Sequence, residues 1–276
     1  MIRPKADYDF YLDLWRLRAD GEAFSTHSSD LMPVRDSEGR PAMLKLPIEK
    51  YEKAGSILMQ FWDGEGTARV LGFHDGALLL ERPEGVLRPL SQLVQEGRDD
   101  EATQIICEAI AVLHRPRPAA RLEQLRPQLV ALEPWFKDLV PAPEKYGEPF
   151  GRSLAIAQEL LATQTEIVPL HGDIHHDNII DFGARGWLVI DPKPLIGDSA
   201  FDYANLFCNP NLETATDPQL FKARLARVCA QSGIERQRML RWLIAWTGLS
   251  AVWFLEDHQS DDIDMGVMQL ALAELN

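Results

Sequence analysis

The sequence predicts an α+β fold with two lobes: a small N-terminal lobe of antiparallel strands with one main helix, and a larger, mostly α-helical C-terminal lobe. Two patterns indicate this division. Short apolar runs separated by turn residues fill the chain up to residue 81, whereas apolar residues at helical spacing dominate from residue 101 onward. A chain of 276 residues is long enough for two buried cores. We therefore expect an N-terminal lobe at residues 1–87, ending in a hinge at residues 81–87, and a C-terminal lobe at residues 88–276.

The N-terminal lobe is expected to start with a helix over residues 7–19, ended by a glycine. Two or three strands follow within residues 23–46, with a hairpin turn between them. A second helix is predicted over residues 48–62, directly after a proline, which is favoured at helix starts. Strands over residues 68–73 and 77–81 flank a further turn.

The C-terminal lobe is predicted to consist of packed helices joined by loops. Their expected ranges are 101–114, 122–140 (interrupted by two prolines), 151–164, 217–232, 235–258 and 265–275, and another helix begins within residues 201–207. Trp242, Trp246 and Trp253 lie at helical spacing within the long helix at 235–258. We assign these tryptophans to the core rather than to a binding surface.

The composition is that of a soluble globular protein, 46% hydrophobic and 25% charged. A formal net charge of −14 argues against a nucleic-acid partner, which needs a basic surface, and is compatible with a cationic small molecule. No apolar run approaches the length of a membrane span, and the N-terminus lacks the apolar core of a signal peptide. The three cysteines are scattered and odd in number, which suits a reducing compartment. We therefore expect a cytoplasmic protein without membrane attachment.

The polar residues with most chemical capacity lie within residues 171–193. Two short apolar runs joined by a glycine-containing turn, over residues 179–190, predict a β-hairpin. Asp173, Asn178 and Asp191 lie at its ends, and their oxygen atoms suit a hard cation such as Mg²⁺. A zinc site built from the histidines near Asp173 is the alternative.

The spacing of these residues matches the catalytic loop of kinases, His-x-Asp-x-x-x-x-Asn, followed by a second metal-binding Asp. In that scheme Asp173 accepts the proton of the substrate hydroxyl. Asn178 and Asp191 hold the Mg²⁺ ions that bridge the phosphates of the nucleotide. The sequence thus predicts phosphoryl transfer to a hydroxyl group.

The motif His171-Gly172-Asp173, followed by His176-x-Asn178 and by Val189-Ile190-Asp191-Pro192, resembles the aminoglycoside phosphotransferase family. The likeness is closest to the branch of streptomycin 6-phosphotransferases and hydroxyurea phosphotransferases, and it extends more weakly over most of the chain. It implies a protein-kinase-like fold. It also implies an enzyme that uses Mg²⁺ and transfers the γ-phosphoryl group of ATP or GTP to a hydroxyl of an aminoglycoside such as streptomycin, giving antibiotic resistance.

The resemblance further implies a nucleotide site in the N-terminal lobe. Lys45, at the end of an apolar strand, takes the place of the kinase lysine that pairs with the phosphates. Glu52 is its expected partner on the following helix, and Glu49 is the alternative.

Two other segments are expected to contact the nucleotide. Ser28 and Ser29 belong to a Ser/Thr-rich loop that would cover the phosphates in place of a glycine-rich one, although an ordinary polar turn is the alternative. The hinge would bind the nucleotide base through the segment that contains Glu81, Arg82 and Glu84.

Supporting roles around the catalytic loop follow from the same resemblance. His171 is expected to support the loop, and Asp202 to bind its backbone amides. Asp198 is the second candidate for the latter role, but it could equally be a helix N-cap.

An acidic stretch near the C-terminus is the candidate substrate site. The resemblance implies that Glu256, Asp257 and Asp261 meet cationic groups of the acceptor, and a solvated loop between helices is the alternative. The partners expected are therefore a nucleotide and a cationic small molecule, without nucleic acid or membrane.

Other functions stay open at this point. The same fold could phosphorylate another small metabolite, such as hydroxyurea, an amino alcohol, an amino acid or a sugar. A nucleotide-binding regulatory module without catalysis is the alternative from a different class, although the catalytic set in residues 171–193 is complete.

Overall fold

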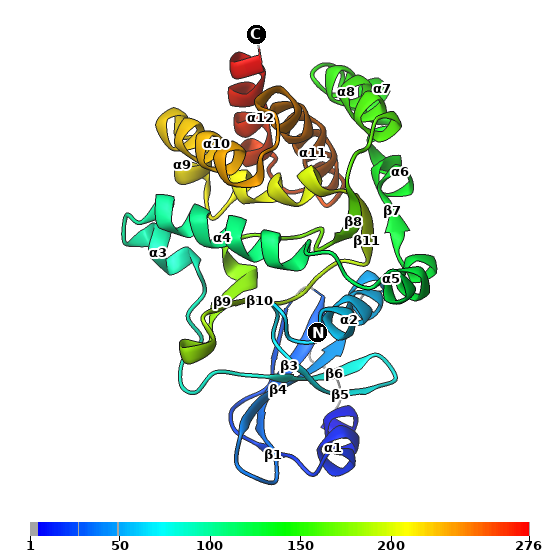
Figure 1. Ribbon diagram of the computed structural model, residues 1–276, viewed down its shortest axis with the longest axis vertical. Helices are drawn as coiled ribbons and strands as arrows, with labels where there is room; N and C mark the ends of the chain where they lie inside the picture. Colours follow the sequence, from blue (N-terminus) through cyan, green and yellow to red (C-terminus); the bar gives the residue numbers. More distant parts are fainter. Residues whose placement is uncertain (1–4, 27, 49, 276) are drawn as a thin grey trace.

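The N-terminal part of the protein is built around a six-stranded antiparallel sheet, drawn in the lower half of Figure 1. The computed structural model describes residues 5–26, 28–48 and 50–275. The strands run in the order β1-β3-β4-β6-β5, and β2 pairs with β3. The bounds are β1 Arg18–Ala19, β2 Phe24–Ser25, β3 Ser29–Arg35, β4 Pro41–Pro47, β5 Val70–His74 and β6 Ala77–Glu81, with helices α1 Lys5–Leu14 and α2 Lys50–Trp62.

The central strand β4 is buried on both of its faces, and its residues alternate between them. Leu44 belongs to the cluster that includes Tyr8 of α1. Met43 belongs to the opposite cluster, with Met59 of α2. Lys45 shares the side of Met43, because side chains two residues apart in a strand point to the same face. The sheet therefore directs Lys45 toward α2 and away from α1.

The C-terminal part is mostly helical and fills the upper half of Figure 1. Its α-helices are α3 Ser91–Gln95, α4 Asp99–Leu113, α5 Ala119–Leu125, α6 Leu132–Trp135, α7 Ala142–Tyr146, α8 Phe150–Ala162, α9 Leu212–Ala215, α10 Pro218–Ser232, α11 Arg236–Glu256 and α12 Asp262–Leu275. Short 3₁₀ helices are η1 Arg126–Gln128, η2 Phe136–Leu139, η3 His176–Asn178, η4 Gly183–Arg185, η5 Ser199–Tyr203 and η6 Asn205–Cys208.

The C-terminal part also contains two small sheets. Strands β9 Ile179–Asp181 and β10 Trp187–Val189 form an antiparallel hairpin. Strand β11 Leu195–Asp198 pairs antiparallel with β8 Ile167–Leu170 and parallel with β7 Val130–Ala131. The hairpin predicted within residues 179–190 is thereby confirmed.

Helix α11 is the centre of the C-terminal core. Its residues are buried almost without interruption from Met239 to Val252, because α8 and α12 both pack against it. A helix that is apolar on all sides is stable only when neighbours cover it in this way. Trp242, which is fully buried, has the core position that the sequence predicts.

A buried arginine ties the helices to the loop that leads into the site. Arg224 of α10 is 2% exposed and pairs with Asp99 of α4, with N–O distances of 2.5–3.2 Å. Its Nη1 also donates to the carbonyl oxygens of Leu206, at 3.0 Å, and Asn209, at 2.7 Å. A buried charge is tolerated when its donors are satisfied in this manner, so Arg224 fixes the loop around η6.

The N-terminal and C-terminal parts meet closely along α2. Gly55 lies against the backbone of Pro192, and a Cβ atom at this position would be 1.9 Å from the Pro192 carbonyl oxygen. Four residues earlier on α2, the ring of Tyr51 lies 5.2 Å from that of Trp135. Further contact comes from Ala68, whose amide donates to the Val189 carbonyl at 3.2 Å.

Several predicted element boundaries were wrong. The first helix ends at Leu14, and residues 18–19 form β1 instead. The region 122–140 is not one interrupted helix but consists of α5, η1, β7, α6 and η2; α5 ends just before Pro127, whereas Pro134 lies within the short helix α6. Residues 199–208 form 3₁₀ turns rather than an α-helix, and α12 begins at Asp262 instead of residue 265.

The broad architecture agrees with the expected α+β class, since an antiparallel sheet region precedes a mostly helical remainder. The division of the chain at residue 87 stays a prediction. Within the described ranges, no helix combines the length and apolarity that a membrane span requires.

Candidate active site

The catalytic-loop segment lies between β8 and η3 and is held by a buried carboxylate. Asp202 accepts hydrogen bonds from the amides of His171, at 2.9 Å, and Gly172, at 2.7 Å, and the Nε2 atom of His114 lies 2.8 Å away. Gly172 has φ +73°, and a Cβ there would lie 2.6 Å from the Leu195 side chain. Only glycine fits this turn without strain, so the backbone turns sharply just before Asp173.

Asp198, the second candidate for binding the backbone amides of the loop, has a different role. Asp198 accepts from the amide of Ala200 at 3.0 Å and caps η5. Its other oxygen accepts from the amide of Thr165 at 2.8 Å. Asp198 is therefore an N-cap, and Asp202 is the residue placed to hold the loop.

His171 connects the loop to the segment before Asp191. It is fully buried, its Nδ1 accepts from the Asp173 amide at 3.3 Å, and its Nε2 lies 2.8 Å from the Ile190 carbonyl oxygen. Because a carbonyl can only accept, Nε2 carries the proton. Burial lowers the pKa of His171 more than the nearby carboxylates of Asp202 and Asp173 raise it, so the ring stays neutral.

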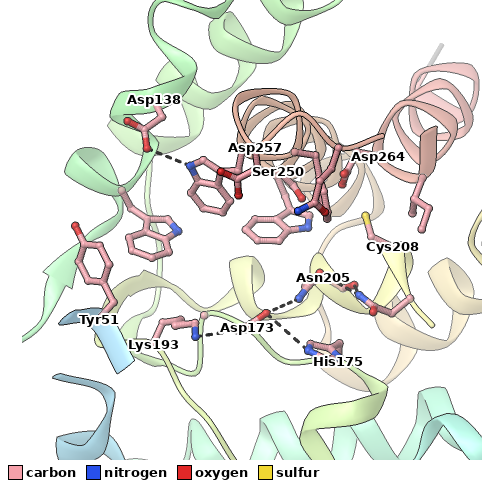
Figure 2. A pocket seen from close by; sticks show the side chains of 18 of the residues that line it. Tyr51, Asp138, Asp173, His175, Lys193, Asn205, Cys208, Ser250, Asp257 and Asp264 are labelled. Atoms are coloured by element: carbon pink, nitrogen blue, oxygen red, sulfur yellow. Dashed lines mark hydrogen bonds and ion pairs between the residues drawn. The ribbon is translucent and has the colours of Figure 1, made fainter. Parts of the chain in front are cut away.

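Asp173 lies on the floor of a pocket and is surrounded by donors (Figure 2). Asn205 Nδ2 donates to its Oδ1 at 2.9 Å, and His175 Nε2 lies 4.0 Å from the same atom. Lys193 Nζ lies 3.7 Å from Oδ2. Asn209 in turn donates to the carbonyl and side-chain oxygens of Asn205, at 2.9 and 3.2 Å. This chain of amides orients the Asp173 carboxylate.

Lys45 reaches across from β4 to Asp191, with 2.6 Å between Nζ and Oδ1. Lys45 is 3% exposed. Burial raises the pKa of Asp191, but the positive charge and hydrogen bond of Lys45 outweigh it, and the net pKa is lowered. Asp191 has φ +62°, a strained conformation of the kind that collects at functional sites.

The β9–β10 hairpin brings Asn178 close to Asp191. Its carbonyl accepts from the Ile190 amide at 2.9 Å, and its Nδ2 donates to the Asp173 carbonyl at 2.9 Å. The neighbouring oxygen donors of Asn178 and Asp191 fit a divalent cation that keeps water or phosphate ligands as well. In the described ranges, no group of three or more His, Cys, Asp and Glu side chains could hold a metal, as a zinc site would require.

The structure describes only the backbone position of one of the two expected acidic partners of Lys45. Glu52 lies on α2, but its side chain is outside the described part of the structure, and Glu49 lies outside the described residues. Beside Lys45 and Asp191, a narrow pocket is lined by Gly55, Ser56, Met59, Leu78, Leu80 and Pro192. Its volume is about 10 Å³, room for no more than about one water molecule.

The Ser/Thr-rich loop forms a closed turn at the start of β3. The Ser29 amide donates to Thr26 Oγ1 at 3.1 Å, and Thr26 Oγ1 donates back to the Ser29 carbonyl at 3.1 Å. The Ser28 carbonyl accepts from the Ile48 amide at 2.8 Å. Ser29 pairs with Pro47, two residues from Lys45 along β4, so the turn is near the lysine.

The predicted base-binding side chains have partners within the protein, and their contact with a base stays a prediction. Glu81 accepts from the Arg69 amide at 2.6 Å and pairs with Arg185. Arg82 pairs with Asp20, and Glu84 with Arg35 at 2.9 Å. These ion pairs hold the side chains of Arg82 and Glu84 within the N-terminal part. They hold the Glu81 side chain against Arg185, in the turn of the β9–β10 hairpin. Contacts from residues 81–85 to a base would come from the backbone.

The larger pocket, about 760 Å³, extends from Asp173 along α11. One wall is a continuous series of rings, with centroid distances of 5.2 Å for Tyr51–Trp135, 5.5 Å for Trp135–Trp253 and 5.9 Å for Trp253–Trp246. Trp253 Nε1 donates to Asp138 at 3.1 Å (Figure 2). Trp246 belongs to the core, as predicted, and Trp253 packs against it, but both also line this pocket.

The predicted acidic substrate residues separate. Asp257 lines the pocket, but Glu256 faces Lys145 at 3.5 Å, and Asp261 is not part of the lining. Consecutive helical residues point about 100° apart, which explains the difference between Glu256 and Asp257. Sequence reasoning missed Asp138, Asn205 and Asp264, which do line the pocket.

A spacing signal for this pocket was present in the sequence. Trp246, Ser250, Trp253 and Asp257 recur at intervals of four, three and four residues and all line the pocket from one face of α11. Two polar residues within an otherwise apolar stripe distinguish this face from a plain core face.

Comparison with known proteins agrees with the motif resemblance. Residues 14–258 match the family described as aminoglycoside/hydroxyurea antibiotic resistance kinase. The chain is 45% identical over 251 residues to a streptomycin 3''-kinase of Klebsiella pneumoniae, covering 89% of this chain and 91% of that protein. It is 29% identical over 261 residues to a streptomycin 6-kinase of Streptomyces griseus, covering 89% and 81% of the two chains.

Solved structures share the fold at low sequence identity. An ethanolamine kinase of Plasmodium vivax superimposes with a TM-score of 0.64 at 14% identity, covering 99% of this chain and 89% of that one. An aminoglycoside phosphotransferase superimposes with a TM-score of 0.61 at 15% identity, covering 98% of both chains. The expected kinase-like fold is thereby confirmed.

The family match covers most of the chain and agrees with the motifs at residues 171–192. The chain therefore belongs to the aminoglycoside/hydroxyurea antibiotic resistance kinase family and is a phosphotransferase that acts on a hydroxyl group.

Proposed function

We propose that this kinase transfers the γ-phosphoryl group of ATP or GTP to a hydroxyl of streptomycin, with Mg²⁺ as cofactor. The observation that carries the proposal is the position of Asp173, on the floor of a 760 Å³ pocket with an acidic and aromatic lining. The 45% identity to a streptomycin 3''-kinase, against 29% to a 6-kinase, makes the 3'' hydroxyl the first candidate.

Asp173 is the proposed base. Its carboxylate faces the pocket in which the acceptor hydroxyl would lie. The hydroxyl proton passes to it as the oxygen attacks the γ-phosphorus, and the bond from that phosphorus to the β,γ-bridging oxygen breaks to release the nucleoside diphosphate. Lys193, whose Nζ lies 3.7 Å from Asp173 Oδ2, is placed to offset the negative charge of the transferring phosphoryl group.

Lys45, Asn178 and Asp191 form the proposed phosphate and metal site. Lys45 donates to nucleotide phosphates, and its buried position keeps its charge poorly screened. Asn178 and Asp191 supply oxygen ligands to Mg²⁺, which when bound reduces the repulsion between the phosphates and an oxygen nucleophile. The strained backbone of Asp191 is consistent with a carboxylate held for this purpose.

The pocket size favours a large acceptor. Sites of about 300–1,000 Å³ suit molecules of drug size, whereas hydroxyurea or a simple amino alcohol would fill only a small part of 760 Å³. Carboxylates and aromatic rings in the lining both attract cations. A cationic, polyhydroxylated molecule such as streptomycin matches these features.

The direct test is Mg²⁺-dependent consumption of ATP and GTP with a panel of acceptors: streptomycin, other aminoglycosides, hydroxyurea and amino alcohols. We expect turnover with streptomycin, a product heavier by one phosphoryl group, and phosphorus NMR coupling that identifies the modified hydroxyl. Turnover with another acceptor but not with streptomycin would replace the proposed substrate. Nucleotide binding without turnover on any acceptor would favour the regulatory alternative.

Asn205 offers a test of how Asp173 is positioned. Asn205→Ala removes the amide that donates to Asp173 Oδ1, and a hydrogen bond to a charged group is worth about 1.5–3 kcal/mol. We expect kcat to fall about 10- to 100-fold, with the KM for ATP little changed. Asn209→Ala, which acts one step further away, should have a smaller effect. Equal kcat for Asn205→Ala and the wild type would contradict the positioning role.

A further inference from the structure

The large pocket beside Asp173 includes a residue of the N-terminal part, Tyr51. All the other described residues that line this pocket lie at position 134 or later in the chain. Tyr51 is on α2, and 42% of its surface is exposed. Figure 2 shows it at the opposite end of the pocket from Cys208 and Asp264. An acceptor that fills the pocket would therefore contact both halves of the molecule.

The ring of Tyr51 forms a corner with the ring of Trp135. The two centroids are 5.2 Å apart, and the ring planes make an angle of 83°. Trp135 also packs against Trp253, with 5.5 Å between centroids, so the side of the corner that belongs to the C-terminal part is held in place. Two aromatic faces at right angles suit the carbon–hydrogen face of a sugar-type ring and attract a cationic group attached to it.

One face of α2 connects Tyr51 to the pair formed by Lys45 and Asp191. Gly55 lies one helical turn after Tyr51 and is in close contact with the backbone of the residue that follows Asp191. Met59 lies one turn further, and both Gly55 and Met59 line the narrow pocket beside Lys45 and Asp191. Residues four apart on a helix share a face. The same face of α2 thus contacts the acceptor pocket and the proposed phosphate and metal site.

Binding of a nucleotide would act on this helix. Lys45 belongs to β4, whereas Asp191 follows β10, so phosphates and Mg²⁺ bound at this pair would fix the distance between the N-terminal and C-terminal parts. Met43 of β4 and Met59 of α2 belong to the same buried cluster. Because packed interiors deform little, a displacement of β4 carries α2 with it.

We propose that Tyr51 contacts the acceptor and thereby couples acceptor binding to nucleotide binding. The inference rests on the proposed function for the identity of the acceptor and for the nucleotide site at Lys45 and Asp191. A bound nucleotide holds α2 against the C-terminal part, so the acceptor meets a corner of Tyr51 and Trp135 that is already formed. By thermodynamic linkage, the acceptor strengthens nucleotide binding by the same factor.

The test is the ratio of two dissociation constants for streptomycin, without and with Mg²⁺ and an ATP analogue that carries nitrogen at the β,γ-bridging position. We expect a ratio of about 5–10 in the wild type and close to one in Tyr51→Ala. Tyr51→Phe keeps the ring and should restore the ratio. Since Tyr51 does not line the narrow pocket, the analogue alone should bind all three proteins with similar affinity, which also shows that the variants are folded.

Phe254→Ala is the matched control. Phe254 lines the same pocket and is 40% exposed, but it lies on α11 in the C-terminal part. Its replacement should weaken streptomycin binding and leave the ratio at the wild-type value. A ratio equally reduced in Phe254→Ala and Tyr51→Ala would overturn the coupling, because any loss from the pocket would then have the same effect.

Two further results would also refute the coupling: a wild-type ratio in Tyr51→Ala, or a ratio of one in the wild type. The second is measured on the unaltered protein, so it decides the question even if a variant fails to fold. Either result with continued phosphorylation of streptomycin leaves the proposed function intact. Absence of streptomycin phosphorylation by the wild type refutes the proposed function instead, and the ratio is then measured with the acceptor that is turned over.

Discussion

Asp173→Ala is expected to lower kcat by about 10²–10⁴-fold, the usual contribution of a positioned general base. The carboxylate is the acceptor of the hydroxyl proton in the proposed reaction, and three neighbouring side chains hold it at the pocket floor. Asp173 lines the acceptor pocket, whereas Lys45 and Asp191 pair with each other outside its lining, so nucleotide binding should survive the change. Steady-state kinetics with streptomycin and ATP, combined with a direct nucleotide-binding measurement, would separate the two effects.

Asp177→Asn is the matched control for this variant. Asp177 belongs to the same loop but is exposed, and its carboxylate accepts from Ser91 rather than facing the pocket. Its replacement removes one negative charge four residues from Asp173. If both variants keep wild-type kcat, Asp173 is not the base, and if both lose activity equally, a general electrostatic effect is responsible.

Asp191→Asn should reduce turnover by about 10²–10³-fold or more, the cost of losing a preorganised charge that stabilises a transition state. Asparagine tolerates the left-handed backbone that Asp191 adopts at φ +62°, so the variant removes charge without adding strain. It also leaves the buried ammonium of Lys45 without its carboxylate at 2.6 Å. Activity should therefore be lost at all Mg²⁺ concentrations that saturate the wild type.

The measurement for Asp191 is turnover and Mg·ATP affinity as a function of Mg²⁺ concentration, with thermal unfolding recorded in parallel to separate stability from catalysis. Asp181→Asn is a suitable control, because Asp181 is on the same hairpin but pairs with Arg88 at 3.7 Å. Normal turnover by Asp191→Asn at ordinary Mg²⁺ concentrations would refute the metal role.

The catalytic loop could be predicted from sequence because its spacing is local. Asp173, Asn178 and Asp191 lie within 19 residues, and the intervening hairpin brings Asn178 next to Ile190 with a 2.9 Å hydrogen bond. The choice of Lys45 rests on the resemblance to the kinase strand, and the alternation of β4 agrees with it by turning Lys45 toward α2 and Asp191.

The acceptor pocket could not be predicted in the same way. Asp138, Asn205 and Asp264 come from η2, η6 and α12, and only helix packing brings them to one cavity. An acidic stretch near the C-terminus gave a plausible alternative, but helix phase turns Glu256 outward and Asp257 inward. Asp264 lay just before the predicted start of α12, so its buried position was not apparent.

The close approach at Gly55 has a consequence for how the gene tolerates mutation. The residue takes no part in chemistry, yet a single added methyl group would collide with the Pro192 carbonyl, one residue from Asp191. If α2 moved away from this segment, the N-terminal and C-terminal parts would separate, and Lys45 would move away from Asp191. In a population of random variants under antibiotic selection, position 55 should be nearly as depleted of substitutions as position 173. A survey of tolerated variants would thus find position 55, where glycine only allows two segments to approach, nearly as intolerant of substitution as a catalytic position.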